Sequence, residues 1–108
     1  MPQSDPFQTK LAAVTDAHER LVARLTRLSP MAWRSRRAAA EEVLRALAAI
    51  SARQQGRDLP APVVEVHVLP YAVAVVGRDV LDTTASASDL QTLQEVEAAL
   101  RSALEATR

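Results

Sequence analysis

The spacing of apolar residues changes near residue 62, and this change constrains the fold more than any other feature of the chain. Before it, apolar side chains recur at helical intervals: the first run steps by 3, 4, 3, 4 and 3 from Leu11 to Leu28, with His18 as its one polar member. After it, residues 64–68 alternate valine with polar side chains, a pattern typical of a strand with one buried face. The sequence therefore predicts helices followed by a sheet.

Two helices are expected before the change in spacing. The first covers about residues 7–28, and Ser4 or Asp5 can cap it ahead of a proline in the first helical position. Ser29 is then followed by another proline, which predicts the cap and first turn of a second helix. Because so few residues connect them, we expect the two helices to pair as a basic helical hairpin over residues 7–56.

The remaining segments complete the predicted domain. Residues 1–6 are expected to be a flexible lead and residues 57–62 a linker, since both are rich in proline and polar residues. Residues 63–83 are expected to form antiparallel strands, with Gly77 at the first central position of a hairpin turn. A capping-box pattern then predicts a C-terminal helix over residues 88–106.

This order predicts a single α+β domain over residues 1–108. We expect two helices, a two- or three-stranded antiparallel sheet and a third helix, with the helices packed on one face of the sheet. Alanine, leucine and valine dominate the apolar residues, which predicts a thin, helix-rich core. A small sheet with unguarded edges and a thin core both favour pairing with a second copy, so we expect a homodimer.

Charge is divided between the two halves of the chain. Residues 1–57 carry ten basic and five acidic side chains, a balance of +5. Residues 58–108 carry three basic and eight acidic side chains, a balance of −5, so the whole chain sums to zero. Such asymmetry indicates either an interaction surface or the packing of one half on the other.

Six arginines near the Ser29 corner are the first candidate binding site. The three in the first helix fall within about 60° of one another, given the 100° step of a helix. The six are Arg20, Arg24, Arg27, Arg34, Arg36 and Arg37. With the free N–H groups of a helix start, they could hold phosphate or nucleic acid. Alternatively they are solvated charges, since twelve arginines against one lysine is typical of a GC-rich bacterial genome.

Both histidines are candidates of another kind. His18 lies among the apolar positions of the first helix, where we expect a structural role or, at a subunit interface, a pH-sensitive one. Glu65 and His67 share one face of the predicted strand, and with Tyr71 they could line a ligand or catalytic site. The alternative for Glu65 and His67 is a solvated strand face.

Metal and cofactor sites are not expected. Asp79, Asp82 and Asp89 could offer oxygen ligands to Mg²⁺ or Ca²⁺, but their spacing matches no calcium-loop pattern. Asp89 also suits the first turn of a helix, where a negative charge is favourable. The chain has no cysteine and two glycines, which excludes Cys-based zinc sites and disulfides and argues against phosphate-cradling loops.

The function predicted from these features is protein–protein association by a small cytoplasmic protein without enzymatic activity. We expect a homodimer and a further protein partner. Binding of nucleic acid or polyphosphate through the arginines is the alternative, and an enzyme or ligand carrier is a third possibility. The apolar runs are too short to span a bilayer, and Met1 to Lys10 lack the pattern of a signal peptide.

Overall fold

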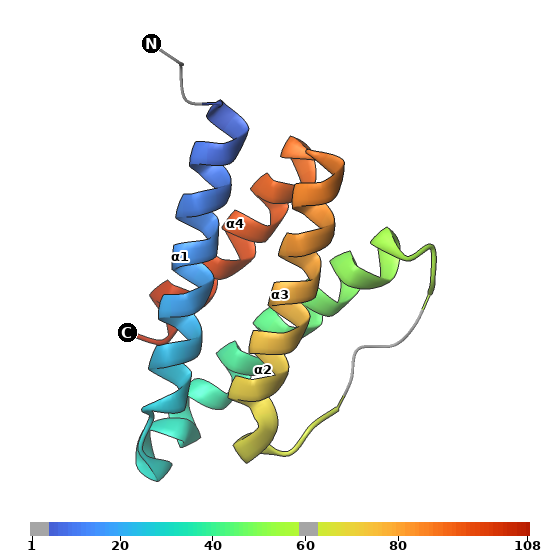
Figure 1. Cartoon of the computed structure of the whole chain (residues 1–108). Coiled ribbons are helices and arrows are strands. Elements are labelled where there is room, and N and C mark those ends of the chain that lie inside the picture. Colours follow the sequence, from blue (N-terminus) through green and yellow to red (C-terminus); the bar gives the residue numbers. More distant parts are fainter. Residues whose placement is uncertain (1–4, 59–62) are drawn as a thin grey trace.

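The computed structural model describes residues 5–58 and 63–108, which form four α-helices and one short 3-10 turn (Figure 1). The elements are α1 (Pro6–Thr26), α2 (Pro30–Gln54), η1 (Val66–Val68), α3 (Leu69–Ala87) and α4 (Leu90–Ala106). These described residues contain no strand. The fold is therefore an all-α four-helix bundle, and the α+β prediction is wrong.

The first two helices form where predicted because their start signals are strong. Asp5 caps α1 by accepting a hydrogen bond from the Phe7 N–H at 2.9 Å. Ser29 caps α2 by accepting a hydrogen bond from the Ala32 N–H at 3.1 Å. Each helix then has a proline in its first turn, where no N–H is needed. Trp33 of α2 is partly buried, and the buried residues of this helix are Ala40, Val43, Leu44, Leu47 and Ile50.

The strands predicted over residues 63–83 are wrong because this stretch forms η1 and most of α3. Pro70 lies in the first turn of α3, where a proline suits a helix. Gly77 does not form a hairpin turn but lies within α3. The buried residues of α3 recur at helical intervals and are Leu69, Val73, Gly77, Val80, Leu81 and Thr84. The argument that exposed sheet edges drive dimerisation therefore no longer applies.

A tight corner joins α3 to α4. Ser88 ends α3 in the left-handed conformation with φ of 51°, and the Asp89 N–H donates to the Thr84 carbonyl at 3.2 Å. Asp89 then caps α4 by accepting a hydrogen bond from the Thr92 N–H at 3.1 Å. The C-terminal helix is thus confirmed, although Asp89 rather than Ser88 is its cap.

Two pairs of helices that follow each other in sequence, α1 with α2 and α3 with α4, scarcely pack along their lengths. Instead α1 and α2 each pack against both α3 and α4. Figure 1 shows α1 beside α3, with α4 crossing α1 and α2 crossing α3. The corner at Ser29 therefore spreads α1 and α2 apart, and the predicted hairpin-like pairing of these helices is wrong.

The core is built mainly from leucine and valine rather than alanine. Its largest fully buried apolar side chains are Leu21, Leu25, Leu44, Leu47, Leu69, Leu93, Leu100, Val14, Val73, Val80 and Val96. Ala40 and Ala103 are the only core alanines among the described residues. Leu90, the first residue of α4, is 47% exposed.

His18 and Gly77 set the distance between α1 and α3. The His18 ring is buried, and its Nε2 lies 3.1 Å from the carbonyl oxygen of Val73. Because a carbonyl only accepts, Nε2 carries the proton and donates. A Cβ built on Gly77 would overlap the His18 ring, so only glycine leaves room for this contact. The residue that looked like a turn signal is therefore a packing site inside a helix.

Replacing Gly77 with alanine tests this contact. In an ordinary helix the change would stabilise by about 0.5–1 kcal/mol. Here we expect Gly77→Ala to lower the free energy of unfolding by about 1–3 kcal/mol, because the new methyl group overpacks against His18. Urea denaturation measures the change. In a His18→Ala background the same substitution should become stabilising, and a stabilising effect in the wild-type background would contradict the contact.

Candidate functional site

Arg24 and Arg36, two of the six candidate arginines, hold the carboxyl end of α4. The Arg24 guanidinium donates to the Leu104 carbonyl at 2.7 Å and lies 3.4 Å from the Thr107 hydroxyl. Arg36 donates to the main-chain oxygen of Arg108. The last carbonyls of a helix lack partners within it and form the negative end of its dipole, so a cation there is favourable. These two residues therefore have a structural role.

The other four arginines divide into paired and exposed residues. Arg20 and Arg37 form ion pairs with acidic residues four positions away in their own helices, at 3.0 and 3.5 Å. Arg27 and Arg34 are exposed, and no hydrogen bond or ion pair joins their side chains to another residue in the described ranges. Anion or nucleic-acid binding at this corner stays a prediction, now with Arg27 and Arg34 as its only unengaged arginines within those ranges.

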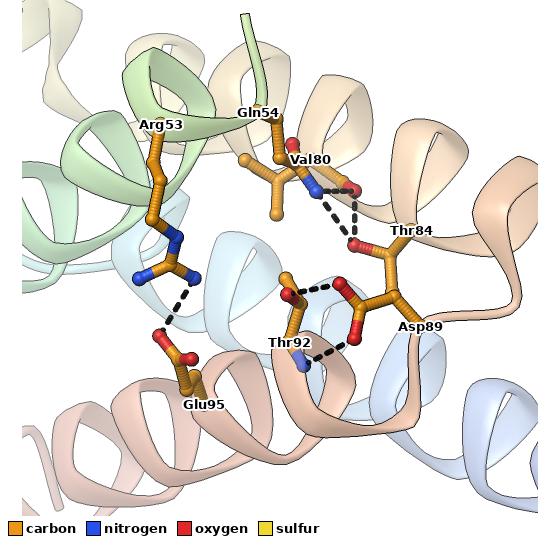
Figure 2. A network of polar contacts seen from close by, with 7 residues as sticks. All are labelled: Arg53, Gln54, Val80, Thr84, Asp89, Thr92 and Glu95. Carbon is orange, nitrogen blue, oxygen red and sulfur yellow. Dashed lines mark hydrogen bonds and ion pairs between the residues drawn. The ribbon is translucent and has the colours of Figure 1, made fainter. Parts of the chain in front are cut away.

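Ion pairs between the two halves of the chain neutralise part of the charge asymmetry. Lys10 of α1 pairs with Glu97 of α4 at 3.1 Å. Arg53 of α2 pairs with Glu95 of α4 at 2.9 Å (Figure 2). Pairs this exposed contribute only about 0–1 kcal/mol each. They nevertheless place basic side chains of the first half against acidic side chains of the second.

A polar network joins α2 to α3 beside the Arg53 pair (Figure 2). The Gln54 side-chain N–H donates to the buried Thr84 hydroxyl at 2.9 Å. Thr84 in turn donates to the Val80 carbonyl at 2.7 Å. Across the described residues, every buried side-chain nitrogen or oxygen has a partner. The interior therefore offers no unsatisfied polar group that a ligand would complete.

Glu65, His67 and Tyr71 do not converge as a catalytic group. His67 and Tyr71 line a shallow depression together with Trp33 and Val22, but Glu65 is not among its lining residues. Glu65 and His67 are both exposed. The predicted pairing on a strand face is wrong because these residues lie at and beside η1.

The three aspartates do not form a metal site. Asp79 and Asp82 lie on α3, where Asp79 accepts a hydrogen bond from Ser51 at 3.3 Å and Asp82 pairs with Arg78 at 3.5 Å. Asp89 caps α4. Within residues 5–58 and 63–108, no three His, Asp or Glu side chains come together as metal ligands.

A groove along α1 and α3 is the surface feature that the sequence did not reveal. Three adjoining depressions share Ala74 and run from the η1 end of α3 past its middle. We call this surface the α1–α3 groove; its α1 and α2 side is lined by His18, Glu19, Val22, Ala23, Leu25, Thr26 and Trp33, and its other side by Val66, His67, Pro70, Tyr71, Ala74, Val75, Arg78, Asp79 and Asp82. Tyr71 is 71% exposed and Val75 is 48% exposed.

The groove was missed because its residues share a face only if α3 is a helix. Tyr71, Val75, Arg78 and Asp82 step by 4, 3 and 4, which is a helical spacing. A strand would place Tyr71 and Val75 on one face and Arg78 and Asp82 on the other. This helical spacing is the feature of the sequence from which the groove could have been predicted.

The chain resembles nothing in the comparisons with known proteins. No protein-family model, curated protein or solved structure matches it. In the part of the chain that the structure describes, no helix is long and apolar enough to cross a membrane.

Arg24 and Arg27 allow a matched test of the structural role of the arginines. We expect Arg24→Gln to lower the free energy of unfolding by about 1–3 kcal/mol, because it removes charged hydrogen bonds to the end of α4. Arg27→Gln, on the same helix but exposed, should change it by no more than about 0.5 kcal/mol. Urea denaturation of both variants measures the difference. Equal effects would contradict the role of Arg24.

Asp89 should make stability depend on pH in the acid range. Hydrogen bonds from the Thr92 hydroxyl at 2.7 Å and then from the Thr92 N–H hold the pKa of Asp89 below its ordinary value of 3.8. Because the folded-state pKa is the lower one, this stabilisation is present above pH 3.8 and is lost as pH falls through the folded-state pKa.

The Asp89→Asn variant isolates this effect, since asparagine also caps helices but does not titrate. Thermal denaturation at a series of pH values downward from 3.8 should show the wild-type Tm falling more steeply than the variant's. Parallel Tm curves would show that Asp89 does not contribute to the acid sensitivity.

Proposed function

We propose that this protein acts by protein–protein association through the α1–α3 groove. The observation that carries the proposal is the exposure of Tyr71 and Val75 in a groove whose lining includes Val22, Ala74 and Trp33. Tyrosine and tryptophan are enriched at association sites, where such exposed apolar side chains are buried. We therefore expect this surface, rather than the edge of a sheet, to form the contact between chains.

The groove is also suited to binding because its two walls are fixed relative to each other. The His18 contact with Val73 and Gly77 lies directly under it, and His18 itself lines the groove beside Ala74. A surface that is already ordered loses less conformational entropy on binding than a mobile one. The groove can therefore use its modest apolar area efficiently.

Glutamate substitutions at Val75 and Leu90 test the proposal. The two side chains are 48% and 47% exposed, and only Val75 lies in the groove. In sedimentation equilibrium, the apparent mass of the wild-type protein should rise with concentration from 11.7 kDa toward the mass of two chains. Val75→Glu should remain at the mass of one chain, because burying an unpaired carboxylate is costly. Leu90→Glu should behave as the wild type.

Two results would contradict the proposal. One is a wild-type protein that stays at one chain at high micromolar concentration. The other is a Val75→Glu variant that associates as strongly as the wild type. Thermal denaturation of both variants checks that neither change has unfolded the bundle.

A further inference from the structure

The outer face of α3 has a stripe suited to helix pairing. Tyr71, Val75, Arg78 and Asp82 fall within an arc of about 60° on the helix, given its 100° step. Their 4, 3, 4 spacing is that of residues at a two-helix interface. Ala74 lies beside the stripe at the point shared by all three depressions of the groove, so a second helix could approach closely there.

The two ends of this stripe differ in charge. Asp79 and Asp82 lie at the end toward the α4 corner and line the groove there. At the opposite end the groove is lined by His67 and Tyr71, and also by Trp33, whose neighbour Arg34 is exposed. One end therefore carries two carboxylates, of which Asp82 pairs with Arg78 of its own helix at 3.5 Å, and the other end carries a histidine and two aromatic side chains.

We infer that the occupant of the α1–α3 groove is a second copy of this chain, with the two α3 helices antiparallel about a two-fold axis between Ala74 and Val75. The inference rests on the proposed function. In this arrangement each residue meets one equally far from the axis on the other side. Tyr71 faces Arg78 of the partner subunit, and His67, which lies in η1 just before α3, lies toward Asp82 of the partner subunit.

These pairings are complementary in charge and chemistry. An arginine over a tyrosine ring is attracted by the ring's electrons. A histidine N–H can donate to a carboxylate. A parallel arrangement would instead place Arg78 against Arg78 and Asp82 against Asp82, which like-charge repulsion disfavours. A two-fold interface pairs a surface with a copy of itself, and of the parallel and antiparallel forms only the antiparallel one places unlike groups opposite each other.

Cysteine cross-linking tests the arrangement, because the chain contains no cysteine of its own. At 1.5 Å of rise per residue, the two copies of residue 75 lie about 1.5 Å apart along the axis, and the two copies of residue 82 about 22 Å apart. Under mild oxidation we expect Val75→Cys to form a disulfide-linked dimer in most of the protein. His67→Cys and Asp82→Cys should each form little dimer alone, and an equimolar mixture of the two should form the mixed dimer. The Leu90→Cys variant, whose cysteine lies outside the groove, is the control for cross-linking by random collision.

The results separate this inference from the proposed function. If the Asp82→Cys variant cross-links to itself as strongly as the Val75→Cys variant does, the two α3 helices are parallel. That result overturns the inference but not the proposed function. A second outcome also overturns the inference but leaves association through the groove intact. In it, sedimentation shows a dimer that Val75→Glu disrupts, but the Val75→Cys variant cross-links no more than the Leu90→Cys variant. A protein that remains a single chain at every concentration overturns both.

Discussion

The contact between His18 and Gly77 is the constraint on which the rest of the structure depends. It brings α1 onto α3 closely enough for the His18 ring to reach a main-chain carbonyl, so a polar side chain is buried with its donor satisfied. The same contact places Val22 and Ala74 on facing walls and forms the floor of the α1–α3 groove. A packing requirement and the proposed association surface thus have one physical origin.

Three of the four helices could be predicted from the sequence because their signals are local. The Ser29 cap and the regular leucine spacing of α1 need no knowledge of distant residues. The third helix could not be predicted in the same way. Gly77 and the valines of residues 64–68 favour turns and strands locally, and only the contact with His18, 59 residues earlier, explains a glycine inside a helix. Tertiary packing outweighed local preference there.

The candidate site was harder to predict for a related reason. The sequence shows that arginines gather near Ser29, but not that the end of α4 lies against them. Arg24 meets a carbonyl 80 residues away, and this partner turns a candidate ligand-binding residue into a structural one. Conversely, Tyr71 and Val75 share a stripe with Arg78 and Asp82 only in a helix, because a strand would place the last two on the opposite face. Charge division was the better guide, since oppositely charged halves do meet at the Lys10 and Arg53 pairs.

The arrangement of the four helices also has a consequence for how the chain folds. Because α1 scarcely packs on α2 and α3 scarcely packs on α4, forming either of these two pairs alone buries little apolar surface. The core appears only when α1 and α2 meet α3 and α4, so the entropy of closing long loops opposes folding before burial can compensate. Partly folded forms in which only α1 and α2, or only α3 and α4, are in place have little to stabilise them. The bundle should therefore assemble in a single cooperative step, in which each half of the chain serves as the template for the other.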